Sequence, residues 1–414
     1  MNYSKLRTVN KLNVKGKVVF LRLDLNVPIV KSKITSFKRI NATIPTIKYL
    51  LEKDAKVVIL SHFGRPKTKE DLKSGKFSLK PVSKALFERI SEFANKCTFI
   101  DENKGAKVEQ AISAMSNKDV LVLENTRFND VDAKTGKWIE LESGCDQNLS
   151  SYWANLSDVF VNDAFGAAHR KHASTYGIAK YNKKNAIGFL MQEELKVLTS
   201  VQQNAKNPFV VIFGGAKISD KLKAVKAVIE NADKVIISGG MAYTFVAAQG
   251  FDIGTSMVET SMIPVAKELM ATYKDKIAIS TDFMCAPKFA NVAPTYKTQE
   301  DGLGKLMGLD IGKNSIAKFK RIIKTANTVL WNGPMGVTEF SHYENGTNKI
   351  CEAIAERTAN GAFTVIGGGD SAAAAEKLNK ESSFSFISTG GGASLRLIEG
   401  SDLDALASIK KRLF

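Results

Sequence analysis

The feature that most constrains how this chain can fold is the alternation of short apolar runs with stretches of helical spacing. The β-rich runs form two series, 18–23, 57–60, 97–100, 120–123 and 159–161, then 209–213, 235–237, 277–279, 329–331, 363–366 and 384–387. Helical spacing lies between them, for example at 44–51, 82–93, 218–229 and 347–357. Apolar strands that alternate with helices form parallel sheets buried on both faces. The pattern therefore predicts an α/β fold of two doubly wound, Rossmann-like domains with parallel sheets.

The length of 414 residues exceeds the usual size of a single hydrophobic core, which also favours two domains. We expect an N-terminal domain over 1–183, a hinge with a connecting helix over 184–207, and a C-terminal domain over 208–402. The boundary is placed there because 180–185 is polar, 188–198 has helical spacing and Pro208 precedes the next strand. The segment 403–413 is predicted to be an amphipathic helix.

Composition limits the classes of function. The longest apolar runs are too short to span a bilayer, so no membrane partner is expected. The four cysteines are dispersed without a C-x-x-C pair, which predicts free thiols in a reducing cytoplasm. The net charge of +17 is spread along the chain without a zinc-finger, RNP1 or basic-zipper pattern. We therefore expect a surface that attracts small phosphorylated anions and no specific nucleic-acid binding.

A glycine-rich stretch at 364–375 reads T-V-I-G-G-G-D-S-A-A-A-A and predicts a strand, a tight loop and a helix that starts near Ser371. Glycines 367–369 let an anion approach the backbone, and the helix would direct free N–H groups at it. Asp370 would repel a bare anion, so its presence favours a ligand that brings a cation such as Mg²⁺. A turn that only packs a helix on a sheet is the alternative for this motif alone.

Ligands of open α/β sheets bind at the carboxyl ends of the strands, so residues directly after each run are candidates. In the first half these are polar or basic: Asp24, Asn26, His62, Arg65, Arg127, His169 and Arg170. One arginine alone is more typical of a surface ion pair, but several at one edge of a sheet would bind a small multiply charged anion.

In the second half the corresponding residues are glycine-rich, at 214–217, 239–240, 332–336, 367–370 and 389–393. They predict a row of helix N-termini that binds a polyphosphate. Lys217 and Lys221 are four apart and would share one face at the start of the helix after Gly214.

An acid-binding domain and a nucleotide-phosphate domain joined by a hinge predict a phosphoryl-transfer enzyme that closes to exclude water. No general base other than histidine is visible, which indicates a carboxylate acceptor, since a carboxylate is already ionised at neutral pH. A dehydrogenase would want G-x-G-x-x-G after an early strand, and a P-loop kinase would need G-x-x-x-x-G-K-[ST]. A nucleic-acid binder without enzymatic activity rests on the net charge alone.

Over nearly its whole length the chain resembles the phosphoglycerate kinase family. The motifs occur in order and are R-L-D-L-N-V-P, S-H-F-G-R-P-K, E-N-T-R-F, V-N-D-A-F-G-A-A-H-R, G-G-A-K-I-S-D-K, G-M-A-Y-T-F, M-G-L-D-I-G, W-N-G-P-M-G-V, G-G-G-D-S and S-T-G-G-G-A-S-L. The resemblance implies reversible phosphoryl transfer from the acyl phosphate of 1,3-bisphosphoglycerate to ADP, giving 3-phosphoglycerate and MgATP in glycolysis. It also implies a cytoplasmic monomer whose C-terminal segment, 403–414, packs back on the N-terminal domain.

The resemblance also implies roles for individual residues. Those that would bind phosphoglycerate are Asp24, Leu25, Asn26, Arg39, His62, Phe63, Gly64, Arg65, Arg127 and Arg170. Those that would bind the nucleotide are Gly214, Ala216, Lys217, Lys221, Gly308, Leu309, Asn332, Pro334, Glu339, Gly368, Gly369, Asp370 and Ser371. The catalytic residues would be Arg39, Lys217, Gly391 and Gly392, and Asp370 would approach Mg²⁺. Arg39 follows from the resemblance alone.

The sequence departs from the family pattern at 280–286, at 302–306 and at Thr338. All three positions belong to the expected nucleotide side. They leave the preference between ATP and GTP open.

Overall fold

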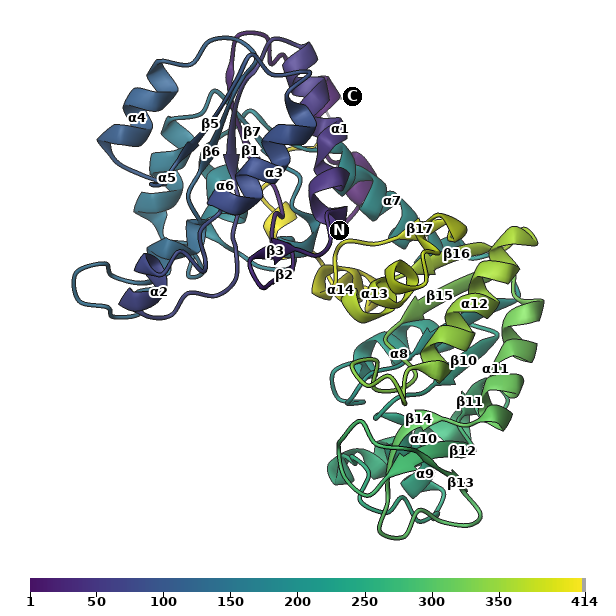
Figure 1. The fold of residues 1–414 in the computed structure, drawn as a ribbon. Helices are drawn as coiled ribbons and strands as arrows, with labels where there is room; N and C mark the ends of the chain where they lie inside the picture. The colour runs from purple at the N-terminus through teal and green to yellow at the C-terminus, as the bar shows by residue number, and fades with distance from the viewer. Residues whose placement is uncertain (412–414) are drawn as a thin grey trace. The chain divides into compact units, whose positions relative to one another are not determined.

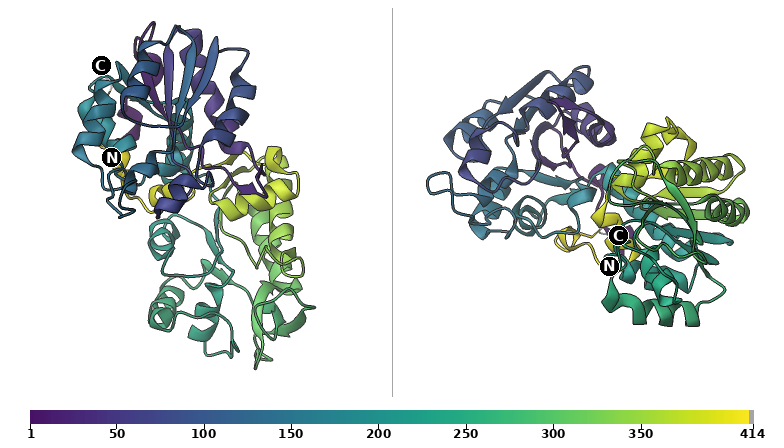
Figure 2. Two further views of the ribbon diagram at one scale, coloured as in Figure 1. Left: turned by 60° about the vertical axis from the view of Figure 1, so that its left-hand side comes forward. Right: turned by 60° about the horizontal axis from the view of Figure 1, so that its bottom comes forward.

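The computed structural model describes residues 1–411 and divides the chain into two compact units. Unit 1 holds residues 1–196 together with the C-terminal segment from Asp402, and unit 2 holds Val197–Ser401. The division falls within helix α7 (Phe189–Asn204). Each unit contains its own sheet with helices on both faces (Figures 1 and 2).

The sheet of unit 1 has six strands, and every neighbouring pair is parallel. Their order is β5 (Lys96–Ile100), β6 (Asp119–Leu123), β4 (Lys56–Leu60), β1 (Val18–Arg22), β7 (Val159–Asn162) and β8 (Asn185–Ile187). Strand β8 lies within the segment expected to be the hinge. The two central strands β4 and β1 are buried throughout except at their first residues, as expected when helices cover both faces.

The helices of unit 1 cover the two faces of this sheet. Helices α1 (Lys38–Glu52) and α3 (Lys80–Ile90) lie on one side, and α4 (Ala106–Ser113) and α5 (Gln147–Asn155) on the other (Figure 1). Ile47 and Leu86 of α1 and α3 share a buried core with Ile59 of β4. Shorter elements are α2 (Lys69–Lys73), α6 (Ile178–Tyr181) and a hairpin of β2 (Ile29–Val30) and β3 (Lys33–Ile34).

Unit 2 repeats the architecture with a second six-stranded parallel sheet. Its order is β11 (Ile277–Ile279), β10 (Lys234–Ile237), β9 (Phe209–Phe213), β15 (Thr328–Asn332), β16 (Phe363–Ile366) and β17 (Phe386–Ile387). The helices are α8 (Leu222–Ile229), α9 (Ala242–Ala248), α10 (Ile263–Thr272), α11 (Lys313–Thr325), α12 (Asn345–Ala359), α13 (Gly369–Lys377) and α14 (Gly392–Ile398). Within residues 1–411 no helix combines the length and apolarity needed to cross a membrane.

The predicted fold class is confirmed, and each apolar run named from the sequence lies in or overlaps a strand of these two sheets. A third, antiparallel sheet of β13 (Thr295–Thr298), β12 (Asp282–Ala286) and β14 (Met307–Ile311) was not predicted. Strand β13 is largely exposed and polar, so it carries no apolar run that would reveal it.

The amphipathic helix predicted over 403–413 is wrong for the described part of that segment, which ends at residue 411. Only a short 3-10 turn forms there, Asp404–Leu406. The backbone instead bonds to the rest of unit 1: Leu403 N–H donates to Tyr3 Oη at 2.9 Å, and Lys410 N–H donates to Asn185 Oδ1 at 2.7 Å. Peptide groups that are bonded to neighbouring segments cannot also form a helical ladder.

The central strands predict where unit 1 is most sensitive to mutation. Ile59 is fully buried between α1, α3 and the sheet, so Ile59→Ala should lower the unfolding free energy of unit 1 by about 3 kcal/mol through lost burial and a cavity. Hydrogen exchange of β1 and β4 amides measures that change. Val30→Ala is the control, because Val30 is 57% exposed and should cost close to nothing. Equal protection in the two variants would contradict this account.

Candidate active site

The first group of predicted binding residues lies in the loops that follow two neighbouring strands of unit 1. Strands β1 and β4 end in register, with Arg22 opposite Leu60, so the loops that follow leave the sheet at the same edge. Asn26 Oδ1 accepts the Gly64 N–H at 2.9 Å, which ties the loop after β1 to the loop after β4. The predicted residues Asp24, Leu25, Asn26, His62, Phe63 and Gly64 therefore lie together.

Arg39 lies in the first turn of α1 and contacts this edge. Its Nη1 forms an ion pair with Asp24 Oδ2 at 2.8 Å, and its side chain is 31% exposed. Arg39 does not directly follow a strand, so the search among residues at the ends of strands did not identify it. The ion pair places it beside the loop after β1.

Further arginines converge on the same edge from other elements. Arg127 follows β6, and its Nη1 donates to the carbonyl oxygen of Gly64 at 2.6 Å. Burial, followed by the positive charges of Arg170, Arg22 and Arg65, lowers the pKa of Arg127 to about 10. Like charges that lower one another's pKa lie close together without enough local negative charge to neutralise them. The edge is therefore suited to a ligand with several negative charges.

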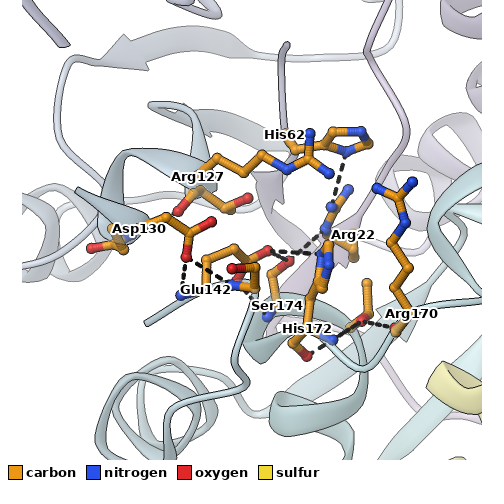
Figure 3. Close-up of polar contacts among 12 residues, drawn as sticks. Arg22, His62, Arg127, Asp130, Glu142, Arg170, His172 and Ser174 are labelled. Atoms are coloured by element: carbon orange, nitrogen blue, oxygen red, sulfur yellow. Dashed lines mark hydrogen bonds and ion pairs between the residues drawn. The ribbon is translucent and has the colours of Figure 1, made fainter. Parts of the chain in front are cut away.

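His62 is buried among these cations (Figure 3). Burial, followed by the charges of Arg22 and Arg127, holds the pKa of His62 well below its usual value, so the ring is neutral. Arg22 Nη2 lies 3.2 Å from His62 Nδ1. Figure 3 shows the side chains of Arg127 and Arg170 beside this pair.

Sequence reasoning did not single out Arg22, Glu142, His172 or Ser174 as members of this cluster. Arg22 carried one available signal, a charged residue at the end of an otherwise apolar strand. The loop residue Glu142 carried none, because nothing in its neighbourhood predicts that it is fully buried.

In unit 2 the glycine loops after β9 and β15 pack directly on each other. Gly214 N–H donates to the Asn332 carbonyl at 3.0 Å, and Gly215 N–H donates to the Pro334 carbonyl at 3.2 Å. A Cβ at Gly214 would lie 1.9 Å from the carbonyl oxygen of Pro334, so only glycine fits at this position. The predicted Ala216 lies next in this loop and is exposed.

The side chain of Lys221 forms hydrogen bonds to both of these loops. Its amine donates to the carbonyl oxygens of Gly214 at 2.6 Å and Asn332 at 2.9 Å, and to Asn332 Oδ1 at 2.7 Å. Burial lowers the pKa of Lys221 and the carboxylates of Asp370 and Asp220 raise it, which leaves it at about 8.

The prediction that Lys217 and Lys221 share a helix face is wrong. Helix α8 begins only at Leu222, and Lys221 is its N-cap residue with its side chain turned back to the loops. Lys217 lies before the helix and is exposed. The segment before α8 forms a turn instead, in which the Lys221 N–H donates to the Ile218 carbonyl at 2.9 Å, and the Lys221 amine bonds to the loops after β9 and β15.

Helix α13 starts at Gly369, close to the helix start expected near Ser371. Ser371 Oγ accepts the Gly333 N–H at 2.7 Å, which joins this helix to the loop after β15. Asp370 is exposed in the first turn, and Gly368 is the N-cap residue. Similarly, Gly391 is the N-cap residue of α14 and Gly392 is its first residue.

A separate part of unit 2 holds the residues expected near the nucleotide base and ribose. A Cβ at Gly308 in β14 would lie 2.0 Å from Tyr243 Oη, so only glycine fits between the strand and α9. Leu309 is buried, and its carbonyl accepts the Val337 N–H at 2.9 Å. Glu339 is exposed two residues further on.

Comparison with known proteins gives one consistent result. The family model described as phosphoglycerate kinase matches residues 9–401. The chain is 48% identical over 408 residues to the phosphoglycerate kinase of Enterococcus faecalis, covering 98% of this chain and 99% of that protein. It is 45% identical to that of Spiroplasma citri over 415 residues, with the same coverage of both chains, 98% and 99%. The solved structure of phosphoglycerate kinase from Coxiella burnetii matches with a TM-score of 0.81 and 32% identity, covering 97% of this chain and 98% of that one.

The pKa of Lys221 predicts a pH dependence of nucleotide binding. If the charged amine contacts phosphate, raising the pH through about 8 removes the charge, and MgATP should bind about tenfold more weakly near pH 9 than near pH 7. Calorimetric titration at several pH values measures this. Lys221→Arg is the matched variant, because a guanidinium stays charged and should remove the pH dependence. A fall in affinity of equal size in both proteins would contradict the assignment.

Proposed function

Because this chain belongs to the phosphoglycerate kinase family, we propose that the basic edge of unit 1 binds phosphoglycerate and the glycine loops of unit 2 bind the nucleotide. The enzyme is a glycolytic phosphotransferase with a carboxyl acceptor. It transfers a phosphoryl group reversibly from the acyl phosphate of 1,3-bisphosphoglycerate to ADP, giving 3-phosphoglycerate and ATP.

The observation that carries the acid-binding assignment is the convergence of arginines whose charges lower one another's pKa. 3-Phosphoglycerate carries a phosphate and a carboxylate, and guanidinium groups donate to both in a forked geometry. The residues proposed to bind it are Asp24, Leu25, Asn26, Arg39, His62, Phe63, Gly64, Arg65, Arg127 and Arg170. Asp24 would orient Arg39 through the ion pair between them.

The nucleotide assignment is supported by the backbone of unit 2. Its phosphates would lie against Lys221, Asn332 and the first turn of α13, where N–H groups and the helix dipole favour negative charge. Leu309 and Gly308 would contact the base, and Glu339 would accept hydrogen bonds from the ribose. Gly214, Ala216 and Pro334 complete the proposed pocket.

Asp370 fits a role in holding Mg²⁺ with the nucleotide. It is an exposed carboxylate in the first turn of α13, next to Lys221, whose pKa it raises. Mg²⁺ takes one or two carboxylates and completes its shell with substrate phosphates and water. Among residues 1–411 no group of three or more His, Cys, Asp or Glu side chains could hold a metal ion, so the phosphates would supply the other ligands. The ion, when bound, neutralises charge on the nucleotide phosphates.

Catalysis of this transfer depends on positive charge around the moving phosphoryl group. We assign that role to Lys217, Arg39 and the N-terminus of α14 at Gly391 and Gly392. Exclusion of water from the site would strengthen these electrostatic interactions. A carboxylate acceptor needs no general base.

The proposed setting is a monomer in the cytoplasm, where the four free cysteines stay reduced. The direct test is ATP-dependent phosphorylation of 3-phosphoglycerate, run in parallel with GTP because of the departures at 280–286, 302–306 and Thr338. Turnover with 3-phosphoglycerate supports the proposal, and no turnover with either nucleotide would refute it.

Lys217→Ala should lower kcat by about a hundred- to a thousandfold, because it removes a positive charge that would stabilise the transferring phosphoryl group. A coupled assay measures turnover, and circular dichroism checks the fold. Lys223→Ala is the control, since Lys223 is also exposed and lies on α8. Wild-type turnover in Lys217→Ala would defeat the assignment.

Arg39→Ala should lower kcat/KM for 3-phosphoglycerate by about a hundredfold, while the Kd for MgATP stays unchanged. Steady-state kinetics and nucleotide titration measure the two effects separately. Arg89→Ala removes an arginine that contacts Asn41 of α1 instead and should leave both unchanged. A defect confined to nucleotide affinity would count against the role given to Arg39.

A further inference from the structure

A chain of buried polar groups runs behind the basic edge of unit 1 (Figure 3). Glu142 accepts hydrogen bonds from the hydroxyl of Ser174 and, at 2.9 Å, from its backbone N–H. Ser174 Oγ accepts the Nε–H of Arg22 at 2.8 Å, and Arg22 Nη2 lies 3.2 Å from Nδ1 of His62. Glu142, Ser174 and Arg22 are each 0% exposed.

The direction of every bond in this chain follows from its charged ends. Arg22 can only donate, so the Ser174 oxygen accepts from it and the Ser174 hydroxyl proton goes to Glu142. Burial raises the pKa of Glu142, while the charge of Arg22 and the hydrogen bonds from Ser174 lower it and favour the carboxylate. A guanidinium only donates, so Nδ1 of His62 must accept from Arg22. A neutral imidazole with an accepting Nδ1 carries its proton on Nε2.

The loop that carries Glu142 is itself anchored. Asp130 Oδ1 accepts the N–H groups of Glu142 and Ser143, each at 2.8 Å. The charge on Glu142 offsets the burial of Arg22, whose pKa burial lowers and Glu142 raises. Asp24 contributes to Arg22 in the same sense but more weakly. Arg22 Nη1 also donates to the Leu23 carbonyl oxygen. Loss of Glu142 would leave the buried charge of Arg22 with less compensation and would weaken the geometry that holds it against His62.

We propose that Glu142 is a positioning residue for phosphoglycerate binding, because through Ser174 and Arg22 it holds His62 as the Nε2–H tautomer, a hydrogen-bond donor to an anionic substrate. The inference rests on the proposed function of the basic edge. The opposite tautomer would present a lone pair at Nε2, which repels a phosphate or carboxylate oxygen.

The tautomer is measurable without substrate. The chain has four histidines, so selective ¹⁵N labelling of histidine gives few signals, and His62→Gln identifies the one from His62. Long-range ¹H–¹⁵N spectra of the wild-type protein should show Nδ1 unprotonated and Nε2 protonated. A wild-type His62 protonated on Nδ1, or on both nitrogens near neutral pH, would overturn the inference even if the enzyme phosphorylates 3-phosphoglycerate.

Ser174→Ala tests the link between Glu142 and Arg22. We expect a mixture of His62 tautomers and a KM for 3-phosphoglycerate about tenfold higher, with the KM for MgATP unchanged. Glu142→Gln should act the same way, because an NH₂ group would replace one of the two carboxylate oxygens that accept from Ser174 and would face a donor.

The matched control is Ser315→Ala in unit 2. Ser315 is also 0% exposed and donates its hydroxyl and its N–H to a buried carboxylate, Asp282, but the hydrogen bonds described for that pair include no arginine. It should leave the His62 signal and the KM for 3-phosphoglycerate unchanged. Equal changes in Ser174→Ala and Ser315→Ala would show a general loss of stability and overturn the positioning role. A shifted tautomer in Ser174→Ala with an unchanged KM for 3-phosphoglycerate would overturn it as well.

Discussion

Both units depend on one constraint, which is that a parallel sheet covered by helices on both faces leaves little room for polar groups except at its edges. The strands are buried almost throughout, so charged and hydrogen-bonding side chains gather where the strands end. Neighbouring parallel strands end at the same edge, so loops that are far apart in the sequence meet there. The candidate sites of both units lie at this edge.

The two units use the edge in different ways. Unit 1 places charged side chains there, and their mutual repulsion is reduced but not cancelled by the ion pair of Asp24 with Arg39 and by the buried Glu142 behind Arg22. Unit 2 instead brings backbone together, and Gly214 allows two loops to touch in a way that a side chain would prevent. The first arrangement suits a small anion with several charges. The second suits phosphates that bind N–H groups and one lysine.

The sequence predicted the sheets well because strand-forming runs are local features. It failed where neighbours decide the conformation. The segment 403–411 has helical spacing but bonds to Tyr3 and Asn185. Helix α8 starts only at Leu222, after a turn whose Lys221 amine bonds to Gly214 and Asn332. Arg39 was found by family resemblance alone, since no strand precedes it.

The sequence by itself determined the fold class and the family, because apolar periodicity and short motifs are readable within a few positions. It also predicted the residues of the two candidate sites. Only the tertiary structure decided how those residues are held. Ser174 lies 152 positions after Arg22, and His62 lies 40 positions after it, yet all three share one hydrogen-bonded chain. The direction of that chain depends on which groups are buried together, and burial is a property of the folded sheet and its loops.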